Sequence, residues 1–195
     1  MNITSVQQDV QNKPGTIEIV LGCMYSGKTS EVIKVCKKWH SISRKAICIN
    51  FEGDTRYGDD EKLYSHDLST VQCIKVSKLE QVDLETIKTG DIILINEGQF
   101  FSDLIEYCLL WCEQYGKDII VSGLDGDFKR RPFGKILDLI PYANSVTKLN
   151  AFCSLCKDGT HAPFTWRLSD EKDQIVIGST NYIAICRKHY CELFK

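Results

Sequence analysis

Residues 22–29, with the sequence GCMYSGKT, constrain the fold of this chain more than any other segment. They fit the pattern G-x-x-x-x-G-K-[ST] in full. An apolar run at residues 16–21 precedes them, and a helix-compatible stretch from about residue 28 to 40 follows. In that context, the backbone N–H groups of the loop and the start of the helix converge on phosphate groups. The segment therefore predicts a site for a nucleoside triphosphate.

Each residue of this phosphate loop is a candidate for binding the nucleotide. We expect Lys28 to reach the β- and γ-phosphates and the Thr29 hydroxyl to bind Mg²⁺. The predicted binding residues are Gly22, Cys23, Met24, Tyr25, Ser26, Gly27, Lys28 and Thr29.

The rest of the first 150 residues reads as an α/β fold. Short apolar runs occur at residues 45–50, 70–76, 91–95, 118–122 and 145–149 and read as buried strands, and residues 102–115 carry apolar side chains at helical spacing. Such alternation favours a parallel sheet with helices on both faces. We therefore expect a flexible N-terminal tail at residues 1–14 and a nucleotide-binding α/β domain at residues 15–150. The pattern changes after residue 150, where two short strand-like runs (164–168 and 174–178) lie among cysteine pairs, so residues 151–195 form a second, small domain.

Composition limits the compartment and the partners. The N-terminal segment is polar, and no run approaches the roughly 18 apolar residues that a membrane span needs. We expect a cytosolic protein without a membrane partner. The net charge of −2 gives no sign of a nucleic-acid partner. In a reducing compartment, clustered cysteines are candidates for metal binding rather than for a disulfide framework.

Two chelating pairs in the C-terminal segment predict a structural zinc site. Cys153-x-x-Cys156 and Cys186-x-x-His189 are separated by 29 residues. Three thiolates and one imidazole form a closed tetrahedral set for Zn²⁺. Cys191 is an alternative fourth ligand, but its spacing from Cys186 is less usual, so His189 is preferred. Six other cysteines read as small buried side chains, namely Cys23, Cys36, Cys48, Cys73, Cys108 and Cys112.

A candidate catalytic carboxylate follows the apolar run at residues 92–95. Asn96 and Glu97 come directly after these four aliphatic residues, where the carboxyl edge of a central strand would face a bound nucleotide. A carboxylate at that edge is well placed to accept a proton from an attacking hydroxyl. Glu97 is thus the candidate general base.

Together these segments resemble the type II thymidine kinases, a family with cytosolic and poxviral members. The similarity runs from about Gly15 to about Tyr190. Besides the phosphate loop and the zinc pairs, it rests on the segments DTRY (54–57), HD (66–67), NEGQFF (96–101) and LDGDFKRRPFG (124–134).

The resemblance implies an ATP- and Mg²⁺-dependent kinase of thymidine, with deoxyuridine left open as a second acceptor. Glu97 matches the family's general base, and Arg56 matches the arginine that, with Lys28, stabilises charge on the transferred phosphoryl group. Asp54, Thr55, Asn96 and Gln99 match further positions at the nucleotide. A lasso-like loop from the zinc domain, here residues 174–178, would lie over the base and hydrogen-bond the edge of thymine through its backbone. Residues matched to the nucleoside site are Met24, Phe100, Leu124, Phe128, Phe133, Thr165, Gln174, Ile175, Val176, Ile177, Gly178 and Tyr182. The family also implies inhibition by dTTP and a homotetramer.

This chain departs from the family in three places. Asn96 stands where the family usually has an aspartate that faces Mg²⁺, so the charge argument predicts a raised Mg²⁺ requirement. Cys23 stands where proline is common, and the loop at residues 178–182 is one residue shorter than in the human enzyme. The first departure bears on metal affinity and the last on the fit of the lasso.

Two other readings stay open on the sequence. A different P-loop class, such as an ATPase, would use Glu97 to activate water but would leave the aromatic residues of segment 124–134 without a role. A zinc-ribbon binding protein could retain a degenerate nucleotide site because of Asn96. The C-terminal segment is mixed in charge rather than basic, which argues against a nucleic-acid module.

Overall fold

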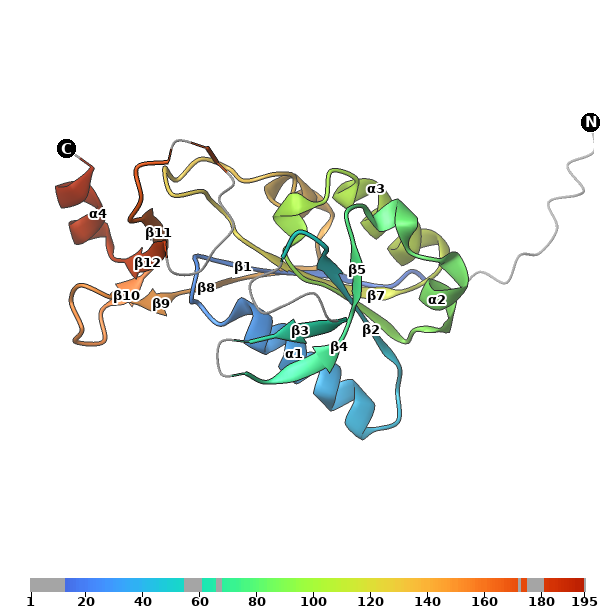
Figure 1. Ribbon diagram of the computed structural model, residues 1–195. Helices are drawn as coiled ribbons and strands as arrows, with labels where there is room; N and C mark the ends of the chain where they lie inside the picture. The colour runs from blue at the N-terminus through green and yellow to red at the C-terminus, as the bar shows by residue number, and fades with distance from the viewer. Residues whose placement is uncertain (1–12, 55–60, 66–67, 172, 175–180, 195) are drawn as a thin grey trace, which may run out of the picture.

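The computed structural model describes residues 13–54, 61–65, 68–171, 173–174 and 181–194. Within these ranges, six strands form a central sheet in the order β5-β2-β6-β7-β1-β8, and every neighbouring pair is parallel (Figure 1). The strands are β1 (Ile17–Gly22), β2 (Ala46–Phe51), β5 (Ile74–Val76), β6 (Ile92–Ile95), β7 (Asp118–Gly123) and β8 (Ser145–Leu149). The predicted α/β class with a parallel sheet is confirmed.

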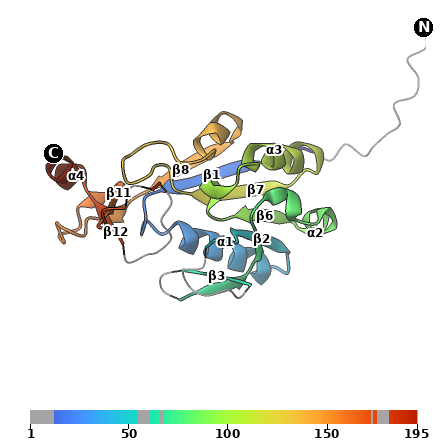
Figure 2. The ribbon, with the colours of Figure 1, turned by 45° about the horizontal axis from the view of Figure 1, so that its top comes forward.

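Helices cover both faces of this sheet (Figure 2). One face carries α1 (Lys28–Ser41) together with a two-stranded antiparallel ribbon of β3 (Lys62–Tyr64) and β4 (Thr70–Gln72). The other face carries α2 (Leu84–Thr89), α3 (Leu104–Leu109), the π-helical segment η3 (Leu110–Gln114) and the 3₁₀ turns η1 (Leu79–Gln81) and η4 (Leu137–Tyr142). A further 3₁₀ turn, η2 (Gly98–Phe100), follows β6. In the described part of the chain, the helices are all too short or too polar to cross a membrane.

The alternation of side chains along the strands builds two cores. Ile49, Ile95 and Val121 face α3 and belong to the larger cluster. Their neighbours Cys48 and Leu94 point the other way and pack with α1 and the ribbon. Because successive residues of a strand point to opposite faces, a strand covered on both sides is apolar throughout. This is why the central strands could be recognised from sequence.

Three sequence predictions need correction. Residues 70–76 do not form one strand, because β4 pairs with β3 in the ribbon whereas β5 joins the central sheet. The strand at residues 145–149 exists, but it is the sheet edge and its first four residues are exposed, not buried. The helix predicted at residues 102–115 begins at Leu104 and continues from residue 110 as a π-helical segment.

The described residues of the C-terminal segment form two short hairpins and a helix. Antiparallel pairs form between β9 (Ala151–Phe152) and β10 (His161–Ala162), and between β11 (Phe164–Arg167) and β12 (Tyr182–Ile185). The helix α4 (Arg187–Leu193) follows β12. A small core that includes Tyr190 also contains Cys23 of the phosphate loop, so this segment packs against the nucleotide-binding loop. Of the strand predicted at residues 174–178, residues 175–178 lie outside the described residues.

Candidate active site

The phosphate loop leaves the carboxyl end of β1 and enters α1. Gly27 is the N-cap of α1 and has a φ of 87°, in the left-handed region that glycine adopts without strain. Because the N-cap is a glycine, it has no side chain that could compete with a ligand for the backbone N–H groups at the start of α1. The Lys28 ammonium group donates to the Cys23 carbonyl oxygen at 2.7 Å, within the same loop. The buried Ser26 hydroxyl has no partner in the described part of the chain, as expected of a loop built around an anion.

Glu97 directly follows β6 and is turned by its backbone. Its φ of 55° lies in the left-handed region, and its side chain is only 7% exposed. The Gln99 amide group donates to Glu97 Oε2 at 2.7 Å, while Gln99 Oε1 accepts the Leu124 backbone N–H at 3.0 Å. Gln99 thus fixes the Glu97 carboxylate and ties it to the end of β7. Gly134 approaches so closely that a Cβ there would clash with the Gln99 carbonyl oxygen.

A single cavity of about 390 Å³ brings most of the predicted residues together. One end is formed by the phosphate loop and the other by aromatic residues and the C-terminal hairpin. The predicted residues that line it are Met24, Tyr25, Gly27, Lys28, Thr29, Asp54, Glu97, Gln99, Phe100, Leu124, Phe128, Phe133, Thr165, Gln174 and Tyr182.

Some predicted residues do not line this cavity. Gly22, Cys23 and Ser26 shape the loop without lining it, and Asn96 lies beneath the cavity surface. Thr55, Arg56, Ile175, Val176, Ile177 and Gly178 lie outside the described residues, as do His66 and Asp67.

Aromatic rings form a wall of the cavity. Phe100 stacks on Phe51, with ring centroids 4.9 Å apart, and meets Phe133 edge-on at 5.4 Å. Flat apolar walls of this kind suit a planar heterocycle. Phe51 was not predicted. It ends β2 three residues before Asp54, and that position at the carboxyl edge was the available signal.

Arg167 is a second lining residue that sequence reasoning missed. Its guanidinium carbon lies 3.9 Å from the centroid of the Phe128 ring, and its nitrogens donate to the Tyr182 hydroxyl at 2.7 and 3.2 Å. They also donate to the backbone carbonyl oxygens of residues 171, 173 and 174. One buried cation therefore fixes an aromatic ring, a tyrosine and the start of the segment predicted to be the lasso. No local motif marks Arg167, because its ring partners Phe128 and Tyr182 are brought to it by the fold.

Asp127 also lines the cavity without having been predicted. Its carboxylate accepts from the Arg131 guanidinium at 2.8 Å and from the Gln174 amide group at 3.0 Å. Burial raises the pKa of Asp127, but hydrogen bonds from Arg131, Gln174 and the Lys129 N–H outweigh burial, so the pKa lies below its ordinary value. Asp127 therefore stays ionised and anchors Gln174 to the loop after β7.

Two hydrogen bonds connect the phosphate loop to the C-terminal hairpins. The Cys23 thiol donates to the Ala162 carbonyl oxygen at 3.1 Å. The Met24 backbone N–H donates to the Thr165 hydroxyl at 3.0 Å. Burial raises the pKa of the Cys23 thiol, so it remains a protonated donor. At this position a cysteine supplies a donor that proline lacks.

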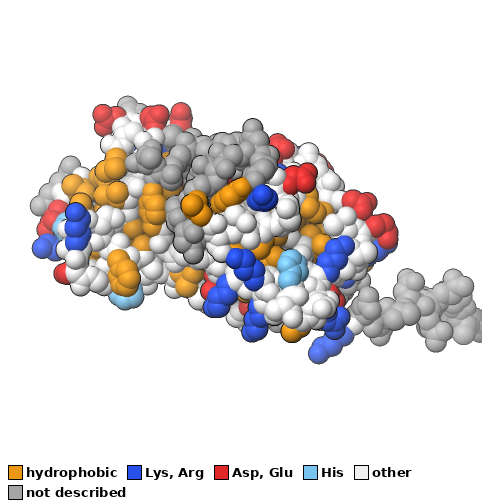
Figure 3. All heavy atoms as spheres, turned by 60° about the horizontal axis from the view of Figure 1, so that its bottom comes forward, with side chains coloured by type: hydrophobic (Ala, Val, Ile, Leu, Met, Phe, Trp, Pro, Cys, Tyr) orange, Lys and Arg blue, Asp and Glu red, His pale blue; other side chains and the backbone are white. Residues whose placement is uncertain are grey.

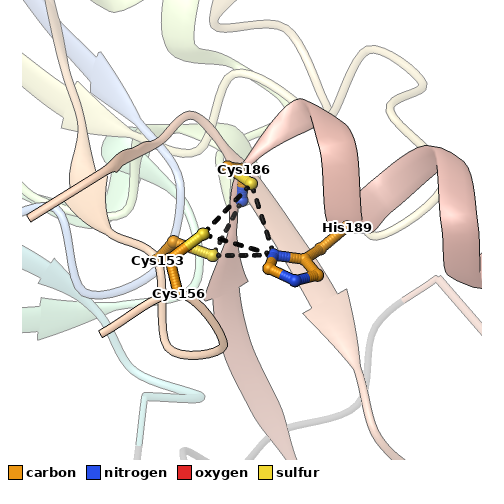
Figure 4. Close-up of side chains that lie close together, drawn as sticks. All are labelled: Cys153, Cys156, Cys186 and His189. Atoms are coloured by element: carbon orange, nitrogen blue, oxygen red, sulfur yellow. Dashed lines mark hydrogen bonds between the residues drawn. The ribbon is translucent and has the colours of Figure 1, made fainter. Parts of the chain in front are cut away.

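Four side chains near the C-terminus converge on one point (Figure 4). Cys153, Cys156, Cys186 and His189 place their ligand atoms within 4.8 Å of one another. The three Sγ···Nδ1 distances are 3.4, 3.4 and 3.5 Å, and Cys156 Sγ lies 3.8 Å from Cys186 Sγ. Tetrahedral zinc with bonds of about 2.0–2.3 Å requires ligand separations of this size. The donor set therefore fits Zn²⁺, as predicted.

The environment of the cluster favours a thiolate. Burial alone would raise the pKa of Cys153, but N–H donors of residues 156, 186 and 155 and the His189 ring lower it to about 6. Cys191, the alternative fourth ligand, is exposed and does not belong to the cluster. Of the six cysteines predicted to be small buried side chains, all are buried.

The basic run at residues 129–131 is largely engaged with the protein itself. The Arg130 guanidinium lies 4.0 Å from the centroid of the Tyr190 ring, and Arg131 pairs with Asp127 at 2.8 Å. On the face that carries α1, several Lys and Arg side chains lie on both sides of a histidine (Figure 3). Arg130 and Arg131 therefore have a structural role around the cavity.

The geometry as a whole suits phosphoryl transfer to a ring-bearing alcohol. A buried, oriented carboxylate lies in one cavity with a phosphate-binding loop and stacked aromatic rings. A hydroxyl near Glu97 would therefore face phosphate groups held by the loop.

Comparison with known proteins agrees with this arrangement. The family model described as thymidine kinase matches residues 15–190. The chain is 39% identical over 185 residues to a thymidine kinase of Yaba monkey tumor virus (strain VR587), which covers 94% of this chain and 99% of the relative. It is 38% identical over 179 residues to the thymidine kinase of vaccinia virus (strain Western Reserve), covering 91% and 98%. Thymidine kinase a of Arabidopsis thaliana is 39% identical over 181 residues, covering 90% and 75%.

Proposed function

The chain belongs to the thymidine kinase family, and on this basis we propose that it transfers the γ-phosphoryl group of ATP to the 5′-hydroxyl of thymidine, forming dTMP for DNA synthesis by salvage. The observation that carries the proposal is the single cavity in which the phosphate loop, the Glu97 carboxylate and the aromatic wall meet. Neither a hydrolytic P-loop enzyme nor a zinc-ribbon binding protein needs all three in one place.

Glu97 acts as the general base in this proposal. As the 5′-oxygen forms its bond to the γ-phosphorus, the bond from that phosphorus to the bridging oxygen breaks, and ADP leaves. The hydroxyl proton passes to the Glu97 carboxylate. The hydrogen bond from Gln99 supports this role, because it fixes the orientation of the Glu97 carboxylate, which lines the cavity.

The phosphate groups are bound by the loop and by cationic side chains. Backbone N–H groups at the start of α1 and the Lys28 ammonium group neutralise the phosphates, and Arg56 stabilises charge on the transferred group. The oxygen groups of Thr29, Asp54 and Glu97 line the same cavity, which fits the preference of Mg²⁺ for oxygen ligands. Mg²⁺, when bound with ATP, supplies positive charge to the β- and γ-phosphates.

Thymine binds at the aromatic end. Phe100, Phe128 and Phe133 contact the ring, and the lasso formed by residues 174–178 supplies backbone hydrogen bonds to its polar edge. The contacts of Arg167 with Phe128 and Tyr182 support this assignment, since they fix the shape of this end before the nucleoside arrives. Deoxyuridine lacks only the thymine methyl group and is a second acceptor in this proposal.

The remaining parts of the proposal follow from the resemblance. Zn²⁺ is structural and lies apart from the reacting phosphates, dTTP inhibits, and the enzyme is a homotetramer in the cytosol. Each of these stays a prediction.

The decisive experiment is an ATP-dependent phosphorylation assay against a panel of nucleosides. Thymidine should be phosphorylated with the highest kcat/KM, deoxyuridine more slowly, and purine nucleosides far more slowly. ATP hydrolysis that is independent of every nucleoside would favour the hydrolytic P-loop class. Binding of ATP and thymidine without turnover would favour a degenerate binding protein.

A further inference from the structure

A chain of buried polar side chains crosses three neighbouring strands at their carboxyl ends. The Ser122 hydroxyl, on β7, donates to Asn96 Oδ1 at 2.8 Å. Asn96, after β6, donates through Nδ2 to Asn50 Oδ1 at 3.0 Å, on β2. The amide group of Asn50 donates in turn to Asp54 Oδ2 at 3.2 Å. We call Ser122, Asn96, Asn50 and Asp54 the amide chain.

The direction of these hydrogen bonds is fixed by the carboxylate at the end. Ionised Asp54 only accepts hydrogen bonds, so Asn50 must turn its NH₂ group toward Asp54. The Asn50 oxygen then faces residue 96, which must donate. Asn96 meets this requirement with its own NH₂ group, and its oxygen is left for the Ser122 hydroxyl. With an amide at position 96, each hydrogen bond of the amide chain therefore has one donor and one acceptor.

Within the amide chain, Asp54 reaches the cavity and Asn96 does not. Asn96 is only 1% exposed and does not line the cavity, whereas Asp54 lines it together with Lys28 and Thr29. Asp54 is thus the carboxylate that the amide chain presents to the cavity.

We propose that Asn96 is a positioning residue that fixes the Asp54 carboxylate through Asn50, and that Asp54 supplies the negative charge toward Mg²⁺·ATP that Asn96 lacks. This inference rests on the proposed function for the identity of the ligand. It assigns to Asn96 a role through its neighbours rather than through direct contact with the metal.

Charge alone predicts that Asn96→Asp strengthens Mg²⁺ binding, whereas the hydrogen bonds of the amide chain predict that it weakens Mg²⁺ binding. Aspartate at position 96 would have no NH₂ group for Asn50 and could only accept. Asn50 would then turn its NH₂ group toward residue 96 and its oxygen toward Asp54, so that two acceptors would face each other. Asn96→Asp should therefore displace the Asp54 carboxylate, although it adds a negative charge below the cavity.

The test compares Asn96→Asp, Asn50→Ala and the double variant with the unmodified chain. Mn²⁺ binding is followed by electron paramagnetic resonance in the presence of a non-hydrolysable ATP analogue, which needs no turnover. Since loss of a residue that orients a metal-facing group typically costs about 10–100-fold, we expect Asn96→Asp to weaken Mn²⁺ binding by about tenfold. Asn50→Ala should cause a similar loss, and the double variant should add little to either single loss.

Asn144→Asp is the matched control. Asn144 directly precedes β8, and its Oδ1 accepts the Ile17 N–H at the amino end of β1 at 2.8 Å. The variant adds the same charge at the opposite end of the sheet, and its carboxylate can still accept that N–H. Mn²⁺ binding should be unchanged in this variant. If Asn96→Asp fails to fold, as judged by thermal unfolding, the Asn50→Ala result alone decides, because it removes the same donor from Asp54.

Two results would overturn the inference. One is tighter or unchanged Mn²⁺ binding in Asn96→Asp, and the other is additive losses in the double variant. Steady-state kinetics separate this inference from the proposed function. If Mn²⁺ binding responds as expected but no nucleoside is phosphorylated, the positioning role stands and the kinase assignment fails.

Discussion

Glu97 owes its orientation to residues beyond its own strand. Its left-handed backbone turns the side chain out of the line of β6, and Gln99 then fixes the carboxylate. A non-glycine residue at positive φ costs free energy that the surrounding structure must offset. The cost of the positive φ at Glu97 is offset by the turn η2 and by the hydrogen bond from the Leu124 N–H to Gln99.

Replacing Glu97 by Gln tests the proposed base directly. The amide keeps the size of the side chain but cannot accept the hydroxyl proton, so kcat should fall by about 10²–10⁴-fold. Binding of ATP and thymidine, measured by calorimetry, should change little. The exposed Glu113→Gln variant removes the same charge away from the cavity and should keep wild-type kcat. Near-normal turnover in Glu97→Gln would remove Glu97 from this role.

Replacing Arg167 by Met tests how the nucleoside end of the cavity is built. The change removes the cation over Phe128 and the donors to Tyr182 while keeping an apolar stem. A cation–π contact shielded from water stabilises by about 2 kcal/mol, and about 1.4 kcal/mol corresponds to tenfold, so the KM for thymidine should rise at least about tenfold.

The KM for ATP distinguishes this role from general damage to the protein. It should stay near its normal value in Arg167→Met, because the phosphate loop is untouched. Arg44→Met, at an exposed arginine paired with Asp91, is the control and should leave both KM values unchanged. An equal rise of both KM values in Arg167→Met would contradict a role at the nucleoside end.

At the scale of elements, α4 carries both candidates for the fourth zinc ligand, and helix geometry separates them. His189 lies in the first turn and points toward the two cysteines of the loop after β9, with Nδ1 3.4 Å from Cys153 Sγ. Cys191, two residues later, points to solvent. Residues two apart on a helix do not share a face, so only one of them can complete the site.

The zinc content of single variants distinguishes His189 from Cys191 as the fourth ligand. We expect one Zn²⁺ per chain in the purified protein, a clear loss in His189→Ala, and no loss in Cys191→Ala. Thymidine binding should also weaken in His189→Ala, because Thr165 and Tyr182 belong to the hairpin that the metal stabilises. Zinc lost from Cys191→Ala but retained in His189→Ala would reverse the ligand assignment.

At the scale of the molecule, the cavity is shared between the sheet and the C-terminal segment. Its floor comes from the carboxyl ends of β1, β2, β6 and β7, and its side wall comes from β11 and β12. The hydrogen bonds from Cys23 and Met24 to that segment join the two parts directly at the phosphate loop. The C-terminal hairpins and the nucleotide-binding loop are therefore directly connected.

A continuous cavity predicts inhibition by dTTP. Its thymine should occupy the aromatic end while its triphosphate extends to the phosphate loop, so that one molecule excludes both substrates. Initial-rate kinetics should show competition with thymidine and with ATP, whereas dGTP should inhibit far more weakly. Absence of inhibition at concentrations well above the thymidine KM would argue against one shared cavity.

Much of this molecule could be predicted because the relevant signals are local. The glycine-rich loop follows a strand and precedes a helix, and the two chelating pairs each lie within four residues. Their geometry depends on backbone conformation over a few residues, so sequence spacing determined it. The central strands were recognisable because burial on both faces makes them apolar throughout.

Tertiary structure alone decided the features that depend on residues far apart in the chain. The sequence marks Asn96 as a candidate metal-facing residue because it follows a strand, but only the tertiary structure shows that its side chain is hydrogen-bonded to Asn50 and Ser122 on the neighbouring strands. Arg167 has no motif, since its partner Phe128 is contributed by the loop after β7. Local spacing determines which side chains can act together within a turn. Strand order and loop packing determine which distant ones meet, because those contacts arise only when the whole sheet has formed.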